Sequence, residues 1–125
     1  MNDRTKEIEK IIFGDKVPDY SFGFARFSGL TAEWLTKLIG LGAASLCDSY
    51  NNSPLVSHYL DFMQTHKGVT AHGTLSSPER GSELTIEGLE CCGDTDKETI
   101  IDFANAFYTA DEFSVSEDRL YCWYD

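Results

Sequence analysis

Apolar residues in the first 67 positions recur at the three- and four-residue spacing of amphipathic helices. The first such stretch, Arg4–Phe13, carries three isoleucines on one face and charged residues on the other. A second stretch follows Thr31, a favourable N-cap, and ends at Gly40. A third begins at Ser53-Pro54, where an N-cap precedes a proline, and ends at Gly68. The pattern therefore predicts three helices in the first half of the chain.

A β-hairpin is predicted where this helical period stops. Two short runs of β-forming residues, 69–76 and 83–89, flank the turn Ser77–Ser82. If the first and last residues of this turn face each other, the apolar pairs are Leu75 with Leu84, Gly73 with Ile86, and Ala71 with Gly88. Leu89 would then fall on the polar face, so we expect a β-bulge near Gly88.

The polar face of this hairpin contains one specific side-chain pair, His72 opposite Glu87. A cross-strand pair of opposite charge on a solvated face contributes about 0.2–1 kcal/mol and needs no function to explain it. In a pocket, the same two residues could form a polar centre for binding or for acid–base chemistry. Both interpretations stay open from the residues alone.

The remaining elements lie in the last 31 residues and before the second helix. Thr95–Glu98 has the spacing of a capping box, and an amphipathic helix follows it. Glu112–Val115 and Arg119–Tyr124 predict a second hairpin that turns at Ser116–Asp118. Alternating aromatic and small residues predict a further strand over Tyr20–Phe27.

Helices grouped early and antiparallel strands grouped late indicate an α+β fold. We expect an antiparallel sheet of four to five strands, formed by the two C-terminal hairpins and one further strand. Three to four helices should cover one of its faces and leave the other face wet. At 125 residues the chain has the length of a single domain, and we expect one domain, 1–125.

Charge is concentrated in the second half of the chain. From Gly68 to Asp125 there are 13 Asp and Glu against 3 Lys and Arg, whereas residues 1–67 have 8 against 7, and the net charge is −11. Such an imbalance favours cationic partners and opposes phosphate groups, so we expect no direct binding to nucleic acid. The candidate protein-binding residues are Glu79, Glu83, Glu87, Glu90, Asp94, Asp96, Glu98, Asp102 and His72.

These acids predict a protein partner with a basic surface. In the strongest form of this hypothesis the chain is a nucleic-acid mimic or an inhibitor or immunity-type protein, whose carboxylates imitate phosphates. The competing interpretation is a merely solvated acidic surface. Two further hypotheses stay open: a homo-oligomer formed through the aromatic C-terminal hairpin, and a small enzyme with a site near His72 and Glu87 or at a cysteine.

Motifs for catalysis, metals and cofactors are missing from the sequence. It contains no Gly-x-Ser-x-Gly, and Cys91 and Cys92 are adjacent instead of having zinc-site spacing. The run Asp94-x-Asp96-x-Glu98 begins like a calcium loop but has Thr99 where glycine is required. We therefore expect no metal and no cofactor, and the balance favours a binding protein over an enzyme.

The first ten residues are polar, and the longest nearly uncharged stretch, Leu38–Cys47, is about half the roughly 20 residues that a membrane span needs. We expect a cytoplasmic protein without a membrane segment. Its four cysteines should then be reduced thiols.

Two stretches carry a resemblance to known proteins. Val69-Thr-Ala-His-Gly to Leu84-Thr-Ile-Glu-Gly-Leu89, with the ending Leu-Tyr-Cys-Trp-Tyr-Asp, resembles small uncharacterised acidic proteins associated with bacterial mobile elements. The resemblance covers the C-terminal half of the chain. It implies a bacterial or phage source and assigns no activity to any residue.

Overall fold

The computed structural model describes residues 3–50, 52–93 and 95–125. These residues form four α-helices, one 3₁₀ turn and one five-stranded antiparallel sheet. The helical elements are α1 (Asp3–Phe13), α2 (Ala32–Gly40), α3 (Val56–Thr65), η1 (Pro78–Arg80) and α4 (Lys97–Phe107). The strands are β1 (Phe24–Leu30), β2 (Thr70–Ser76), β3 (Leu84–Cys92), β4 (Glu112–Val115) and β5 (Arg119–Trp123).

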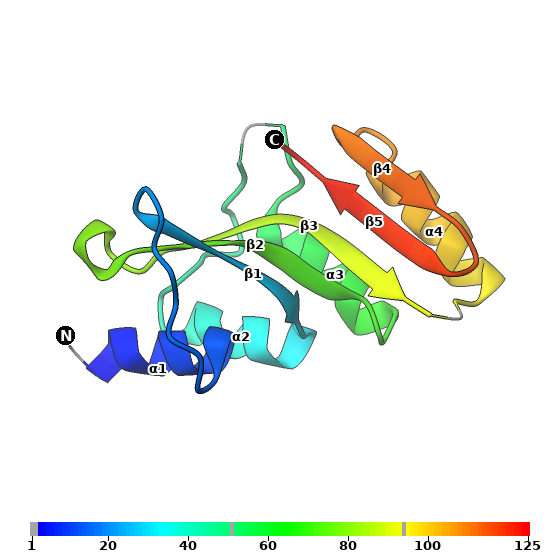
Figure 1. The fold of residues 1–125 in the computed structure, drawn as a ribbon. Coiled ribbons are helices and arrows are strands. Elements are labelled where there is room, and N and C mark those ends of the chain that lie inside the picture. The colour runs from blue at the N-terminus through cyan, green and yellow to red at the C-terminus, as the bar shows by residue number, and fades with distance from the viewer. Residues whose placement is uncertain (1–2, 51, 94) are drawn as a thin grey trace.

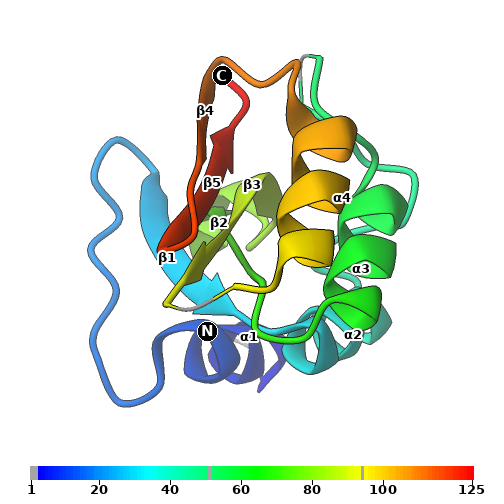
Figure 2. The ribbon, with the colours of Figure 1, turned by 90° about the vertical axis from the view of Figure 1, so that its right-hand side faces the viewer.

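The sheet has the order β1-β2-β3-β5-β4, so that β1 and β4 are its edges (Figure 1). Helices α2, α3 and α4 form a layer on one face, and α1 lies beside α2 below β1. The loop that joins α1 to β1 lies on the opposite side of the sheet (Figure 2). The predicted α+β fold, with two C-terminal hairpins and helices on one sheet face, is confirmed.

The core fills the space between the helices and the sheet. Its largest fully buried side chains come from all layers: Tyr59, Tyr124, Phe103, Phe107, Ile8, Leu35, Leu38, Met63, Leu75, Leu89, Leu120 and Cys122. Aromatic rings connect α3 to α4, because Tyr59 of α3 stacks on Phe107 of α4 with ring centroids 5.8 Å apart. This contact holds α3 and α4 together over the C-terminal strands.

Helix α2 begins as predicted, whereas α3 begins later than predicted. The Thr31 hydroxyl accepts a hydrogen bond from the Trp34 N–H at 3.3 Å and caps α2. In α3 the N-cap is Leu55, and Ser53 and Pro54 lie outside the helix. The Ser53 hydroxyl instead accepts the N–H of Tyr50 at 2.8 Å, so it stabilises the preceding loop.

Helix α4 begins one residue later than the predicted capping box. Its N-cap is Asp96, whose carboxylate accepts the Thr99 N–H at 2.7 Å. The Thr95 hydroxyl donates to the carbonyl of Gly93 at 3.1 Å. Two adjacent residues could cap this helix, and the carboxylate forms the stronger, charge-assisted bond.

Strand β1 covers Phe24–Leu30, four residues later at its start than the predicted Tyr20–Phe27. The residues before it form a tight turn in which Phe22 and Gly23 both have positive φ, +57° and +88°, as in a type I′ turn. The Phe24 N–H closes this turn on the carbonyl of Ser21 at 3.2 Å. Phe22 itself is 97% exposed at the tip.

The β2–β3 hairpin contains the expected bulge, between His72 and Gly73. On the turn side of the bulge, the predicted pairs Leu75 with Leu84 and Gly73 with Ile86 are confirmed. Beyond it, His72 lies opposite Gly88 and Ala71 opposite Leu89, so the predicted pairs His72 with Glu87 and Ala71 with Gly88 are wrong. Glu87 is the additional residue of β3, and the shift turns Leu89 into the core.

Glycine is required at two positions beside this bulge. A Cβ atom at Gly73 would overlap the backbone carbonyl oxygen of Thr85. A Cβ atom at Gly88 would overlap the carbonyl oxygen of Cys122 and lie 2.8 Å from the His72 imidazole. The backbones of β2, β3 and β5 therefore approach closely because both residues lack a side chain.

Candidate protein-binding surface

His72 occupies the space that Gly88 leaves open on the uncovered face of the sheet. Its side chain is 8% exposed, and its Nε2 atom donates to the carbonyl oxygen of Cys122 at 2.8 Å. The imidazole also stacks on the Tyr121 ring, with centroids 5.0 Å apart and planes 4° apart. The Arg119 guanidinium lies 4.6 Å from the centroid of the same ring. His72 thus bridges β2 to β5 across the bulged strand.

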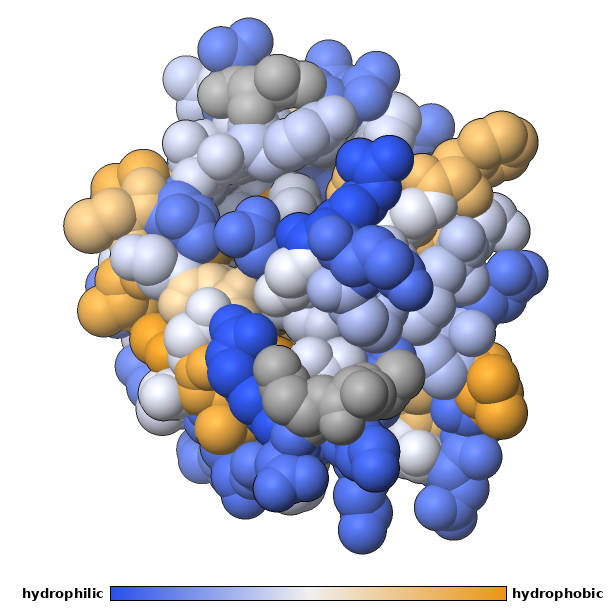
Figure 3. Space-filling model, turned by 90° about the vertical axis from the view of Figure 1, so that its left-hand side faces the viewer, coloured by the Kyte–Doolittle hydropathy of each residue, from blue (hydrophilic) through white to orange (hydrophobic). Residues whose placement is uncertain are grey.

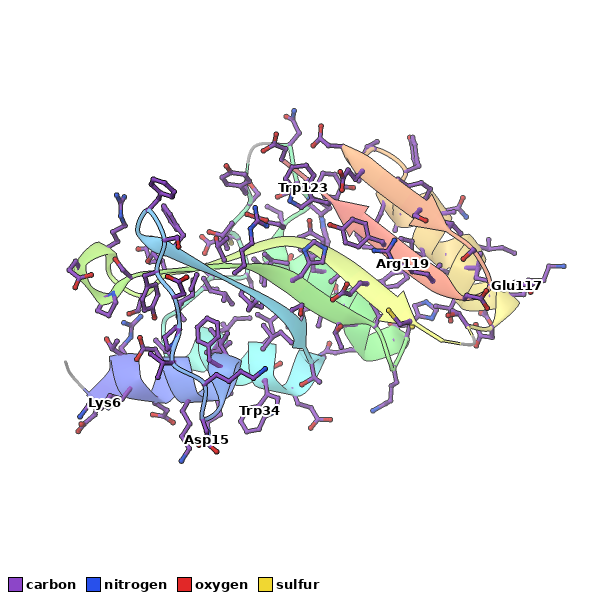
Figure 4. The ribbon with its side chains drawn as sticks, viewed as in Figure 1. Lys6, Asp15, Trp34, Glu117, Arg119 and Trp123 are labelled. Atoms are coloured by element: carbon purple, nitrogen blue, oxygen red, sulfur yellow. The ribbon has the colours of Figure 1, made fainter. Side chains whose placement is uncertain are left out.

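Glu87 has its own partners on this face. Its carboxylate accepts the indole N–H of Trp123 at 3.1 Å and lies 3.8 Å from the Arg26 guanidinium. The imidazole contacts Tyr121 and the Cys122 carbonyl of β5, whereas the carboxylate contacts the side chain of Trp123, the last residue of that strand, which Figure 4 labels. Both groups are used in cross-strand contacts that stabilise the sheet.

Two grooves divide the open face between β1 and β5. One, of about 550 Å³, is lined by His72, Glu90 and Tyr121, and the other, of about 770 Å³, is lined by Glu87. The charged residues that line them are nearly balanced in sign: Lys16 and Arg26 against Asp19, Glu87 and Glu90. The predicted His72–Glu87 centre is therefore not assembled in one groove.

The acidic candidates lie in three separate places. Glu79 and Glu83 are exposed at the β2–β3 turn, at the end of the molecule seen in Figure 3, where polar side chains dominate the centre of the view. Glu87 and Glu90 lie on the open face of β3. Asp96, Glu98 and Asp102 lie at the start of α4 and within it, in the helical layer. Asp94 lies outside the described residues. The seven described acids do not form one contiguous face.

Two of the acids on α4 have structural partners. The Asp96 pKa is lowered because its carboxylate accepts hydrogen bonds from the side chain and backbone of Thr99. The Asp102 carboxylate lies 3.1 Å from the Nε2 atom of His66, which connects α4 to α3. Glu98 is exposed and makes no such contact among the hydrogen bonds and ion pairs of the described residues.

A second group of acids, absent from the sequence-based candidates, surrounds the edge strand β4. It consists of Asp111, Glu112, Glu117, Asp118 and Asp125, all of them exposed. Glu112 lies in β4 itself, and Figure 4 places Glu117 at the turn between β4 and β5. We call this group the acidic rim. Its signal was present in the sequence, because residues 95–125 contain eight Asp and Glu against two Lys and Arg.

The geometry of β4 leaves its outer edge unpaired in the sheet. Glu112 and Ser114 lie opposite Trp123 and Tyr121, and the Ser116 N–H donates to the Arg119 carbonyl at 2.9 Å in the same register. Since hydrogen-bonded pairs alternate along an antiparallel ladder, Glu112 and Ser114 bond to β5. The backbone N–H and C=O groups of Phe113 and Val115 therefore point outward.

Helix α4 supports β4 from the core side. The Phe113 ring stacks on Phe103, with centroids 6.1 Å apart and planes 17° apart. Phe103 is completely buried and also lies 5.0 Å from the Phe107 ring. The edge strand is thus held in place by aromatic contacts while its outer edge faces solvent.

The described part of the chain contains neither a metal-binding cluster nor a membrane-spanning helix. Within residues 3–50, 52–93 and 95–125, no three His, Cys, Asp or Glu side chains come close enough to hold a metal ion. No helix in the described part of the chain has the length and apolar content needed to cross a bilayer. All four cysteines are free, and only Cys122 is fully buried.

Comparison with known proteins gives no relative. No protein-family model, no curated protein and no solved structure matches this chain significantly.

Proposed function

We propose that this chain is a protein-binding domain that engages a basic surface of its partner through α4, β4 and β5. The observation that carries the proposal is the acidic rim, whose five exposed carboxylates surround an unpaired edge strand. Residues 95–125 supply eight of the 21 acids of the chain and only two of its ten basic residues. A field of this sign speeds the encounter with a basic protein and repels nucleic acid.

The inhibitor or mimic form of the hypothesis is the sharpest version of this proposal. Carboxylates fixed around a rigid strand could occupy the phosphate-binding residues of a nuclease or DNA-binding protein. The open sheet face supports this role less well, because the charges that line its grooves are nearly balanced. The homo-oligomer and enzyme hypotheses have no comparable support, since Tyr121, Trp123, His72 and Glu87 are already engaged within the domain.

The proposal is tested by capture of partners from a bacterial lysate on three immobilised proteins. These are the wild type, E117K/D118K in the acidic rim, and E79K/E83K at the β2–β3 turn. The two variants change the net charge equally, and all four side chains are exposed. A partner of the proposed kind should be basic, and E117K/D118K should weaken its retention roughly tenfold, equivalent to ~1.4 kcal/mol.

E79K/E83K should retain the partner as the wild type does. Equal loss from both variants would show that only net charge matters, and retention of no basic protein by the wild type would refute the proposed function. Elution by salt gives an independent check, because contacts between exposed charges weaken as ionic strength rises.

A further inference from the structure

Strand β4 presents a binding edge with a defined length and polarity. Its four residues span about 13 Å at roughly 3.3 Å per residue. The outward groups are the N–H and C=O of Phe113 and Val115, which are two donors and two acceptors in the spacing of a β-ladder. Sheet edges of this kind are used to bind extended peptides, in which backbone bonds supply affinity and side chains supply specificity.

We infer that β4 accepts an extended basic segment of the partner protein as a sixth strand of the sheet. This inference rests on the proposed function and adds how the partner binds. The acidic rim places Asp111 and Asp125 at one end of β4 and Glu117 and Asp118 at the other. Glu112 projects on the open face between these ends, since it lies opposite Trp123. An added strand with Lys or Arg near both ends would meet a carboxylate at each.

The charges argue for a basic segment over a second copy of this chain. Two copies that paired through β4 about a twofold axis would run antiparallel. The turn 116–118 of each copy would then lie beside residues 110–112 of the other. Glu117 and Asp118 would approach Asp111 and Glu112, which are like charges. The acidic rim thus opposes self-pairing at this edge and attracts a strand of opposite charge.

The test uses the full chain and capped eight-residue peptides. The probe alternates lysine with valine, and the first control replaces each valine by proline, which keeps the charge but removes half of the backbone donors and the extended ladder geometry. A second control replaces each lysine by glutamate. Binding is measured by NMR titration, and amide hydrogen exchange is followed at Phe113 and Val115, with Glu112 and Ser114 as internal references.

The lysine–valine peptide should slow exchange at the Phe113 and Val115 amides at least fivefold, because these N–H groups become bonded to the peptide. Glu112 and Ser114 should change much less, since they already bond to β5. The proline peptide should bind at least fivefold more weakly, and the glutamate peptide should not bind. E117K/D118K should also weaken binding of the lysine–valine peptide.

Failure of this inference is distinguishable from failure of the proposed function. If the lysine–valine and proline peptides bind equally, in a salt-dependent way and without protection at Phe113 and Val115, the acidic rim binds basic segments but β4 does not pair with them. If sedimentation shows a dimer with these two amides protected before any peptide is added, a second copy occupies the edge and the inference is wrong. If neither basic peptide binds, the acids only protect the edge, which overturns the inference; the lysate capture then decides the proposed function separately.

Discussion

The β2–β3 hairpin lies in the middle of the sheet, and the β4–β5 hairpin forms its edge. In the first, neighbouring strands occupy both sides, and the bulge at Glu87 is possible only because Gly73 and Gly88 leave room for carbonyl oxygens. In the second, the ladder is regular, the outer strand has four residues, and exposed acids surround it.

This difference separates the residues that determine stability from those that are available for binding. Changes at the buried positions of the central hairpin should destabilise the fold, because they displace backbone atoms or uncover buried groups. Changes at the acidic rim should leave the fold intact and alter only interactions with other molecules.

The largest effect is expected for Gly88→Ala. The new methyl group would overlap the Cys122 carbonyl and crowd the His72 imidazole, so β3 or β5 must shift and the bond between these residues must break. We expect a loss of about 4 kcal/mol or more in the free energy of unfolding, measured in urea. The control is Gly40→Ala, because a Cβ atom at Gly40 would contact nothing within 4 Å. Equal stability of both variants would contradict the role assigned to the bulge.

Cys122 should make the stability depend on alkaline pH. Burial raises the pKa of its thiol from 9.0 to about 12. Between these two values the folded state keeps the neutral thiol while the thiol of the unfolded state ionises. The contribution of the neutral thiol to the free energy of unfolding is therefore complete below pH 9 and is lost as the pH rises toward 12. The loss should be about 3 kcal/mol by pH 11.

The matched variant for this pH test is Cys122→Ser. A serine oxygen can still accept the Leu89 N–H, which lies 3.4 Å from the Cys122 sulfur, but it does not titrate in this range. Burial also raises the pKa of Tyr59, so both proteins should lose stability in alkali. The deciding quantity is the difference in the free energy of unfolding between the wild type and Cys122→Ser, followed from pH 8 to pH 11. A difference that is independent of pH would show that the thiol is solvated.

The elements of both hairpins could be predicted from the sequence, because alternating residues and turn-forming residues are local signals. The existence of the bulge was predicted as well, since Leu89 had no place on a polar face. The pairing of His72 with Gly88 in place of Glu87 could not be predicted. It depends on the Cys122 carbonyl, which lies 50 residues away in the sequence. The shift of the α4 cap from Thr95 to Asp96 shows the same limit, since both residues can cap a helix.

The acidic rim is not identifiable from the sequence, for a different reason. The sequence shows that acidic residues are dense in positions 95–125. Charge alone, however, does not indicate which strand lies at the edge of the sheet. The β2–β3 hairpin has the clearer sequence pattern, but it lies at the centre of the sheet. The order β3-β5-β4 places the C-terminal hairpin outermost, and this order follows from long-range contacts that a local pattern does not contain.

A moderate gain in stability is expected at the turn before β1. Phe22 has a φ of +57°, which costs an L-residue about 1–2 kcal/mol, and its side chain is 97% exposed. Phe22→Asn would place Asn before Gly23, the pair preferred in type I′ turns. We expect about 1 kcal/mol of added stability, measured by thermal and urea unfolding. Val17→Asn is the control, since Val17 is 91% exposed and has no positive φ; an equal gain there would point to solubility instead of turn geometry.

The smallest effect on folding is expected for E117K/D118K. These side chains are exposed. The turn is held by the Ser116 hydroxyl, which bonds the Arg119 backbone, and by the carbonyls of Glu117 and Asp118, which accept the N–H groups of Thr95 and Gly93. The free energy of unfolding should change by less than about 0.5 kcal/mol, while capture of a basic partner should fall roughly tenfold. A loss of stability above about 1 kcal/mol would mean that these carboxylates are part of the fold. The proposed separation between a central hairpin that determines stability and an acidic rim that is available for binding would then be wrong.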